Sequence, residues 1–181
     1  MKKILILLLA SLAGSLGLGA APQQASDPQV EKVLVIFKTH LDIGFTDLSS
    51  KVEQRYIDYY IPKAIEVARR LREEGGDERY VWTTGAWLVD AYLRQATPEA
   101  AAELEEAIRR GDIVWNGVPY TVESESMNRA LFEGILRLSQ RLDARFGKHP
   151  SAAKMTDVPG HTRSIVPLLS EAGIGFLHLG T

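Results

Sequence analysis

Two residue types that bind divalent metal ions stand two positions apart early in the chain. His40 and Asp42 follow a near-continuous apolar run, and Gly44 comes two positions later. On an extended backbone, residues two positions apart point to the same side, so the imidazole and the carboxylate share one face. Zinc accepts both ligand types at about 2.0–2.2 Å, and a glycine lets the backbone turn away afterwards. The pair fits a metal site, although a capping Asp beside a hydrogen-bonding His has the same pattern.

A second polar cluster follows a later strand-like run. Asp157 ends that run and is followed by Pro159, Gly160 and then His161. Asp157 offers a third ligand oxygen at a strand end, but an Asp in this place is also typical of a cap of the Asx type. His161 suits a loop residue that hydrogen-bonds to the main chain. From the residues alone, both interpretations of this cluster stay open.

Apolar runs alternate with amphipathic stretches along the chain. The strands predicted from this pattern are 32–38, 79–84, 112–116 and 152–156, with a further apolar stretch at 174–179. The helices are expected at 48–74, in two short pieces between 84 and 111, at 127–146 and from about 162 onward. Strands that alternate with helices predict an α/β fold with parallel strands and right-handed crossovers. In such folds ligands bind at the carboxyl ends of the strands, where both polar clusters lie.

The number of these units predicts an incomplete barrel. The predicted strand–helix units make up about half of an α/β barrel, which commonly has about 250 residues. The chain has 181 residues and ends just after the fifth apolar stretch. We therefore expect a partial (β/α) barrel with parallel strands, in a chain that continues beyond Thr181. A complete small open sheet is the structural alternative.

Taken together, the two clusters resemble motifs of the N-terminal catalytic domain of the α-mannosidases of glycoside hydrolase family 38. The family's His-Asn-Asp-Pro-Gly-Trp type motif is similar to residues 40–45, and its Asp-Pro-Phe-Gly-His-Ser type motif is similar to residues 157–162. The resemblance covers nearly all of residues 32–181 and places the chain in a divergent bacterial branch. It implies that these residues form the N-terminal half of a barrel of the glycoside hydrolase or deacetylase type.

The resemblance also implies a chemistry. His40, Asp42 and Asp157 would be ligands of a zinc ion, Zn2+, and Asp157 would also be the nucleophile of a retaining glycosidase acting on α-mannosides or related α-glycosides. Phe45, which replaces the family's Trp, is expected to stack beneath the sugar substrate. A retaining glycosidase needs a second carboxyl group about 5–5.5 Å from the nucleophile. The family takes this general acid and a further His ligand from positions that would lie beyond residue 181.

The resemblance is weaker around the expected sugar pocket. Leu41 and Ile43 stand where the family has Asn and Pro, and Val158 and Pro159 replace its Pro and Phe. Residues 117–120 replace a Gly-Gly-Trp stretch. The motifs therefore support the metal more strongly than the mannose.

Two other functions fit parts of the pattern. A metal-dependent polysaccharide deacetylase on a related barrel would use a metal-activated water. Its usual adjacent Asp pair and His-x-x-x-His motif are absent from this sequence. A non-catalytic carbohydrate-binding relative is the second alternative. Trp82, Trp87 and Trp115 lie at apolar positions, where we expect core packing rather than sugar stacking.

The start of the chain predicts export. Lys2 and Lys3 precede an apolar run that contains glycines and ends in small residues, the layout of a signal peptide over residues 1–21. The run is shorter than the roughly 20 apolar residues of a membrane span, so no stable membrane insertion is expected after cleavage. A linker at 22–31 would lead into the domain at 32–181, in a periplasmic or extracellular protein.

Composition excludes some classes of site. The chain has no cysteine, which excludes disulfides and Cys-ligated metals. The formal net charge is −2, and basic residues are interspersed with acidic ones. No nucleic-acid partner is therefore expected.

Overall fold

The computed structural model describes residues 31, 33, 35, 38 and 40–180. The predicted signal peptide, nearly all of the linker and most of the first predicted strand lie outside these residues. The chain divides into residues 1–34 and residues 35–181, and the fold described below belongs to the second unit. None of the helices in the described part combines the length and apolar character that a membrane crossing requires.

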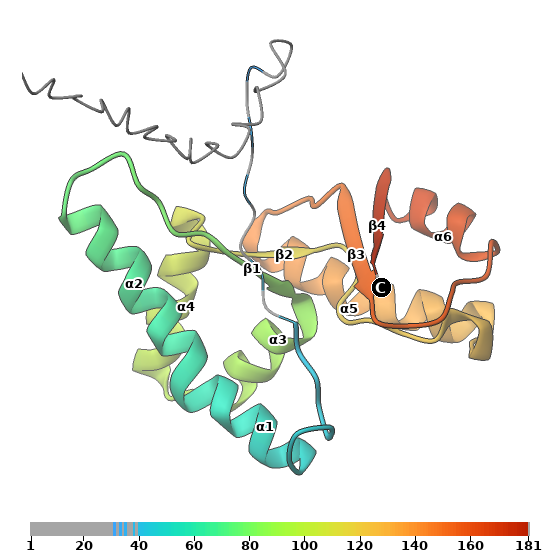
Figure 1. The fold of residues 1–181 in the computed structure, drawn as a ribbon, viewed down its shortest axis with the longest axis horizontal. Coiled ribbons are helices and arrows are strands. Elements are labelled where there is room, and N and C mark those ends of the chain that lie inside the picture. Colours follow the sequence, from blue (N-terminus) through green and yellow to red (C-terminus); the bar gives the residue numbers. More distant parts are fainter. Residues whose placement is uncertain (1–30, 32, 34, 36–37, 39, 181) are drawn as a thin grey trace, which may run out of the picture. The chain divides into compact units, whose positions relative to one another are not determined.

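Helices alternate with short parallel strands in the described part of the chain (Figure 1). The strands are β1 Trp82–Gly85, β2 Ile113–Asn116, β3 Ala152–Thr156 and β4 Phe176–Gly180. The helices are α1 Ser49–Arg55, the π-helix η1 Tyr56–Tyr60, α2 Ile61–Glu73, α3 Ala86–Gln95, α4 Pro98–Arg110, the 3-10 helix η2 Ser124–Ser126, α5 Arg129–Phe146 and α6 Ile165–Glu171. β1 pairs with β2, and β3 with β4, each in parallel. The α/β prediction is confirmed, and the predicted strands after residue 40 are found within a few residues of their expected bounds.

The parallel pairs stand as two separate two-stranded sheets. Lys38 forms a parallel bridge with Thr83 of β1, which places the end of the first predicted strand beside β1. Between β2 and β3, the side chain of Asn116 replaces some of the backbone hydrogen bonds that would join paired strands. Its Oδ1 accepts hydrogen bonds from the backbone N–H of Val118 at 3.1 Å and of Lys154 at 3.4 Å. Neighbouring strands thus follow sequence order, as in part of a barrel. The described residues form no closed barrel, and the half-barrel stays a prediction.

Local sequence signals explain where the helices begin and end. The Thr97 hydroxyl accepts from the N–H of Ala100 at 3.3 Å at the start of α4, and Gly111 ends that helix with φ 86°. Thr97 followed by Pro98 is a typical start signal of a helix, and Gly111 in the left-handed region is a typical stop signal. The predicted helix 48–74 is α1, η1 and α2 in succession. Pro62 has no backbone N–H and cannot donate a hydrogen bond to the preceding helical turn. The π-helix η1, which lies just before it, accommodates this missing hydrogen bond.

Two apolar clusters pack the strands against the helices. One joins α1–α4 with β1 and β2 and contains Trp82 and Trp115, both buried as predicted, with Trp87 packed against it. The other joins α5, α6 and β3, where Met155 is fully buried. Burying each large side chain stabilises the fold by about 1.5–3 kcal/mol. Because strand side chains alternate, the opposite face of β3 is free to carry polar groups.

Candidate active site at the carboxyl ends of the strands

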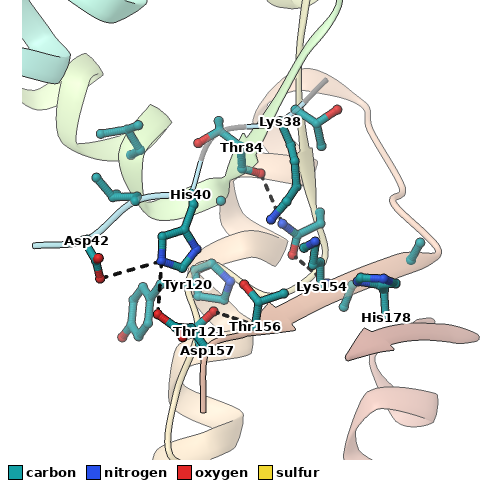
Figure 2. A pocket seen from close by; sticks show the side chains of 18 of the residues that line it. Lys38, His40, Asp42, Thr84, Tyr120, Thr121, Lys154, Thr156, Asp157 and His178 are labelled. Atoms are coloured by element: carbon teal, nitrogen blue, oxygen red, sulfur yellow. Dashed lines mark hydrogen bonds and ion pairs between the residues drawn. The ribbon is translucent and has the colours of Figure 1, made fainter. Parts of the chain in front are cut away.

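A cavity of about 740 Å³ lies against the inner face of the strands and their carboxyl ends (Figure 2). Its lining includes residues of each of the four strands and extends from Lys38 beside β1 to His178 on β4. The loop after β2 closes one side of the cavity with Pro119 and Tyr120. Gly85 permits this arrangement, because a Cβ there would collide with the carbonyl oxygen of Pro119.

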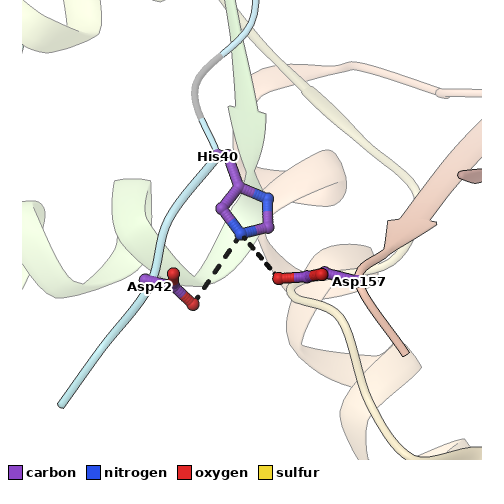
Figure 3. Close-up of side chains that lie close together, drawn as sticks. All are labelled: His40, Asp42 and Asp157. Atoms are coloured by element: carbon purple, nitrogen blue, oxygen red, sulfur yellow. Dashed lines mark ion pairs between the residues drawn. The ribbon is translucent and has the colours of Figure 1, made fainter. Parts of the chain in front are cut away.

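Three predicted ligands meet at the rim of this cavity (Figure 3). His40 Nε2 lies 3.7 Å from Asp42 Oδ1 and 3.5 Å from Asp157 Oδ2. One ligand atom from each residue can be chosen so that all three lie within 4.8 Å of one another. The side chains are 45 %, 46 % and 69 % exposed, in the order His40, Asp42, Asp157, so they are open to solvent and to a ligand.

The geometry and charge of this trio fit a zinc ion. Ligand atoms about 2.0–2.2 Å from a tetrahedral ion lie about 3.3–3.6 Å from one another, close to the two distances from the imidazole nitrogen. Two carboxylates and a neutral imidazole together neutralise a divalent cation. Among the described residues no Lys or Arg lies within ion-pair distance of Asp42 or Asp157. His40, Asp42 and Asp157 would hold the ion.

Asp157 has an unusual backbone conformation. Its φ is +66°, and no other described non-glycine residue has a positive φ. Its backbone N–H donates to the carbonyl of Gly180 at 3.1 Å, which continues the pairing of β3 with β4. Residues held in the left-handed region cost roughly 1–3 kcal/mol and concentrate at functional sites. The turn at Asp157 aims its carboxylate at His40 rather than continuing along the strand.

The main chain of His40 is tied to the π-helical segment. The buried Tyr56 hydroxyl donates to the carbonyl oxygen of His40 at 3.3 Å. Burial, with smaller contributions from Tyr60 and Asp42, raises the pKa of Tyr56, so its proton stays in place at neutral pH. After the pair of ligands, Gly44 turns the backbone with φ +83°, as the sequence predicts. The first cluster is thus held by a helix turn on one side and a glycine turn on the other.

His161 lies outside the trio and fixes the loop after β3. Its Nδ1 hydrogen-bonds to the hydroxyl of Ser124 at 3.1 Å, and the same hydroxyl accepts from the N–H of Thr162 at 3.0 Å. Ser124 is 1 % exposed. The expected main-chain partner of His161 is therefore replaced by a buried side chain. Its partner comes from a segment far away in sequence, which local pattern does not reveal.

Phe45 does not line the cavity in this structure. Its side chain is 84 % exposed on the turn after Gly44. Its role as a sugar platform stays a prediction. Tyr120 and Phe176 are aromatic side chains of the cavity lining for which sequence reasoning predicted no role.

Basic groups inside the cavity were also missed. Lys38 and Lys154 both line it, and their side chains interact with each other. Burial, and then the neighbouring Lys154, lowers the pKa of Lys38 to about 8. The alternation along β3, with Ala153 and Met155 in the core, places Lys154 on the cavity face and was the available signal.

Comparison with known proteins agrees with this geometry. The family model described as the glycosyl hydrolases family 38 N-terminal domain matches residues 31–179. The match spans both polar clusters, β1 to β3, and all of β4 except its last residue. A search of curated proteins finds no match to the chain.

Proposed function

We propose, because this chain belongs to glycoside hydrolase family 38, that it forms the N-terminal part of an exported, zinc-dependent, retaining glycosidase acting on α-mannosides or related α-glycosides. The single observation that carries the proposal is the convergence of His40, Asp42 and Asp157 at the rim of the cavity. A carbohydrate is the expected substrate because the family consists of glycoside hydrolases.

The residues of the trio have separate tasks in this proposal. His40 and Asp42 would hold the ion from one segment, and Asp157, directly after β3, would complete the set. The bound ion would supply a template that grips hydroxyl groups of the sugar and orients its ring. Asp157 Oδ2 is the oxygen that faces His40. The second carboxylate oxygen is thereby left for attack on the anomeric carbon.

The covalent step follows the retaining pathway. The bond from Asp157 to the anomeric carbon forms as the bond to the leaving oxygen breaks, and that oxygen takes a proton from a general acid. Water then hydrolyses the glycosyl ester, which frees Asp157 and gives a sugar of retained configuration. The proposal requires this general acid but assigns it to no residue of the described part of the chain.

A trapping experiment tests the nucleophile. The full-length protein is incubated with a fluorinated mannosyl fluoride, which slows breakdown of the intermediate more than its formation. Mass spectrometry should find one sugar added to the peptide that contains Asp157. Asp157→Asn should abolish both labelling and turnover, because an amide is a poorer nucleophile and a poorer metal ligand. The matched control is Asp77→Asn, an exposed loop Asp outside the cavity, which should label like the wild type.

Two outcomes would reject this proposal in favour of a named alternative. Release of acetate from acetylated glycans without any labelled peptide would indicate a deacetylase. Absence of hydrolysis of every α-glycoside tested, together with retained sugar binding, would indicate a non-catalytic carbohydrate-binding relative.

Export is a separate part of the proposal and is supported by the basic, apolar and small-residue order of residues 1–21. Mass spectrometry of the protein from its native host should find a new N-terminus between residues 20 and 27, in a periplasmic or extracellular fraction. An intact Met1 in the mature protein would contradict cleavage.

A further inference from the structure

The cavity carries basic groups beside the acidic trio. Lys154 on β3 stands in register with His178 on β4, and both line the cavity together with Lys38. Figure 2 shows the side chain of Lys38 running into the cavity toward Lys154, beside the trio of His40, Asp42 and Asp157. β1 and β2 lie between the strand positions of these two lysines, so their side chains meet because the strands curve around the cavity.

The two lysines have no acidic partner in the described part of the chain. Other lysines there do: Lys63, for example, pairs with Glu66 at 2.8 Å. The two cavity carboxylates that form ion pairs, Asp42 and Asp157, pair instead with His40. Two ammonium groups that face each other in a cavity repel, and the repulsion grows as water is displaced by a ligand. An anion placed between them removes this repulsion and accepts charge-assisted hydrogen bonds from both.

The position of the lysines relates them to a sugar held at the trio. Lys38 precedes His40 by two residues, and Lys154 precedes Asp157 by three. At a strand rise of about 3.3 Å per residue, the Cα positions of Lys38 and Lys154 lie on the order of 7–10 Å along the strands from those of His40 and Asp157. A charged substituent on the sugar ring, or on the adjoining sugar, spans a distance of this order.

We propose that Lys38 and Lys154, with His178 beside them, form a subsite for an anionic oxygen group on the substrate, so that the preferred substrates are acidic α-glycosides. This inference rests on the proposed glycosidase function and names its substrate class. The acidic group is a carboxylate, as in a uronic acid, or a sulfate or phosphate ester, and all three present oxygens that lysine ammonium groups bind.

The first test compares matched substrates. The full-length protein is assayed with aryl α-mannoside, the corresponding α-mannuronide, and the 6-sulfate and 6-phosphate of the same mannoside. The acidic substrate that fits should have a kcat/KM about tenfold or more above the neutral one, the size expected for a charge-assisted hydrogen bond. A preference for the uronide alone indicates a carboxylate substrate, and a preference for the esters indicates a sulfated or phosphorylated one.

Variants assign the preference to the lysines. Lys154→Gln and Lys38→Gln should each reduce the ratio of acidic to neutral kcat/KM to near one, whereas Lys154→Arg should keep most of it because the charge remains. Lys63→Gln, which removes a paired lysine outside the cavity, is the matched control and should leave the ratio unchanged. A thermal melt of each variant shows whether a changed ratio arises from unfolding. An equal kcat/KM for neutral and acidic substrates in the wild type would overturn the inference.

A binding measurement separates failure of the subsite from failure of the proposed function. Inorganic sulfate and inorganic phosphate are titrated into the full-length protein before and after metal removal by a chelator, so that anion binding to a metal is distinguished from binding to the lysines. Anion binding that survives chelation and is lost in Lys154→Gln supports the subsite even if no glycoside is hydrolysed. No such binding, combined with hydrolysis of neutral mannosides, rejects the subsite and leaves the proposed function standing.

Discussion

Asp112 and Asp157 stand at opposite ends of neighbouring strands, and their surroundings differ in every respect. Asp112 lies directly before β2, is 7 % exposed and receives two hydrogen bonds from Arg72 at 2.8 and 2.9 Å and one from Arg110 at 3.1 Å. Asp157 lies directly after β3, has a 69 % exposed side chain and pairs with His40 at 3.5 Å. In α/β folds the amino ends of strands serve stability and the carboxyl ends serve ligands. The same residue type thus has a structural role at one end and, in the proposed function, a binding role at the other.

The charge balance at the two ends explains this division. Burial alone would raise the pKa of Asp112, but the hydrogen bonds and charges of Arg72 and Arg110 outweigh it and lower that pKa. This end is internally neutralised. At the other end, His40 is the only basic side chain of the described residues within ion-pair distance of Asp42 and Asp157, so an added cation would complete the trio. The basic pair Lys38 and Lys154 has no acidic partner among the described residues, so an anion on the substrate would balance its charge.

The largest expected effect is loss of metal from the Asp157 end. Elemental analysis of the full-length wild type should find about one zinc per chain. His40→Ala should lower occupancy, and His40→Ala/Asp42→Ala should remove it, because Asp157 is then the only member of the trio that remains. His161→Ala and Asp112→Asn should keep the metal, since neither residue belongs to the trio. Equal zinc content in the wild type and the double variant would show that the Asp157 end is not a metal site.

The next effect is a loss of stability at the Asp112 end. Asp112→Asn should lower the free energy of unfolding by about 1–3 kcal/mol, because Arg72 and Arg110 lose a charged acceptor. The lower part of that range is the better expectation, since Arg72 is 36 % exposed and water can replace part of the interaction. Chemical denaturation monitored by tryptophan fluorescence measures the change. Arg94→Gln, which removes an exposed partner of Asp90, is the control and should change stability little.

The stability difference between wild type and Asp112→Asn should depend on pH. The folded-state pKa of Asp112 lies below its ordinary value of 3.8. Its contribution is therefore fully present above the unfolded pKa and is lost as the pH falls through the folded one. Denaturation curves of the two proteins should differ at neutral pH. As the pH is lowered below about 4, their free energies of unfolding should become equal. A difference that stays constant across this range would show that charge is not the cause.

The sequence predicted those features of the fold and the site that depend on local residue patterns. The β3 bounds 152–156 and the ends of α4 at Thr97 and Gly111 agree with apolar runs and caps. The meeting of His40, Asp42 and Asp157 followed from their places after strands and from the family motifs. The contact of Lys38 with Lys154 did not, because it depends on how strongly the strands curve. The φ of Asp157 was missed for a related reason: the pairing with Gly180 that holds it comes from a later strand.

The smallest expected effect is a gain in stability at Asp157. In chelator-treated protein, Asp157→Asn should leave the free energy of unfolding unchanged or raise it by up to about 1 kcal/mol, because Asn adopts the left-handed region readily and has no charge beside Asp42. Asp42→Asn distinguishes the two causes, since it removes the same kind of charge at a position without positive φ. A gain in both variants indicates repulsion, and a gain in Asp157→Asn alone indicates backbone strain. Metal must be absent, because zinc bound to the folded wild type would add stability by mass action and hide the effect. A loss comparable to that of Asp112→Asn would mean that Asp157 supports the fold, and the distinction between the two strand ends would then fail.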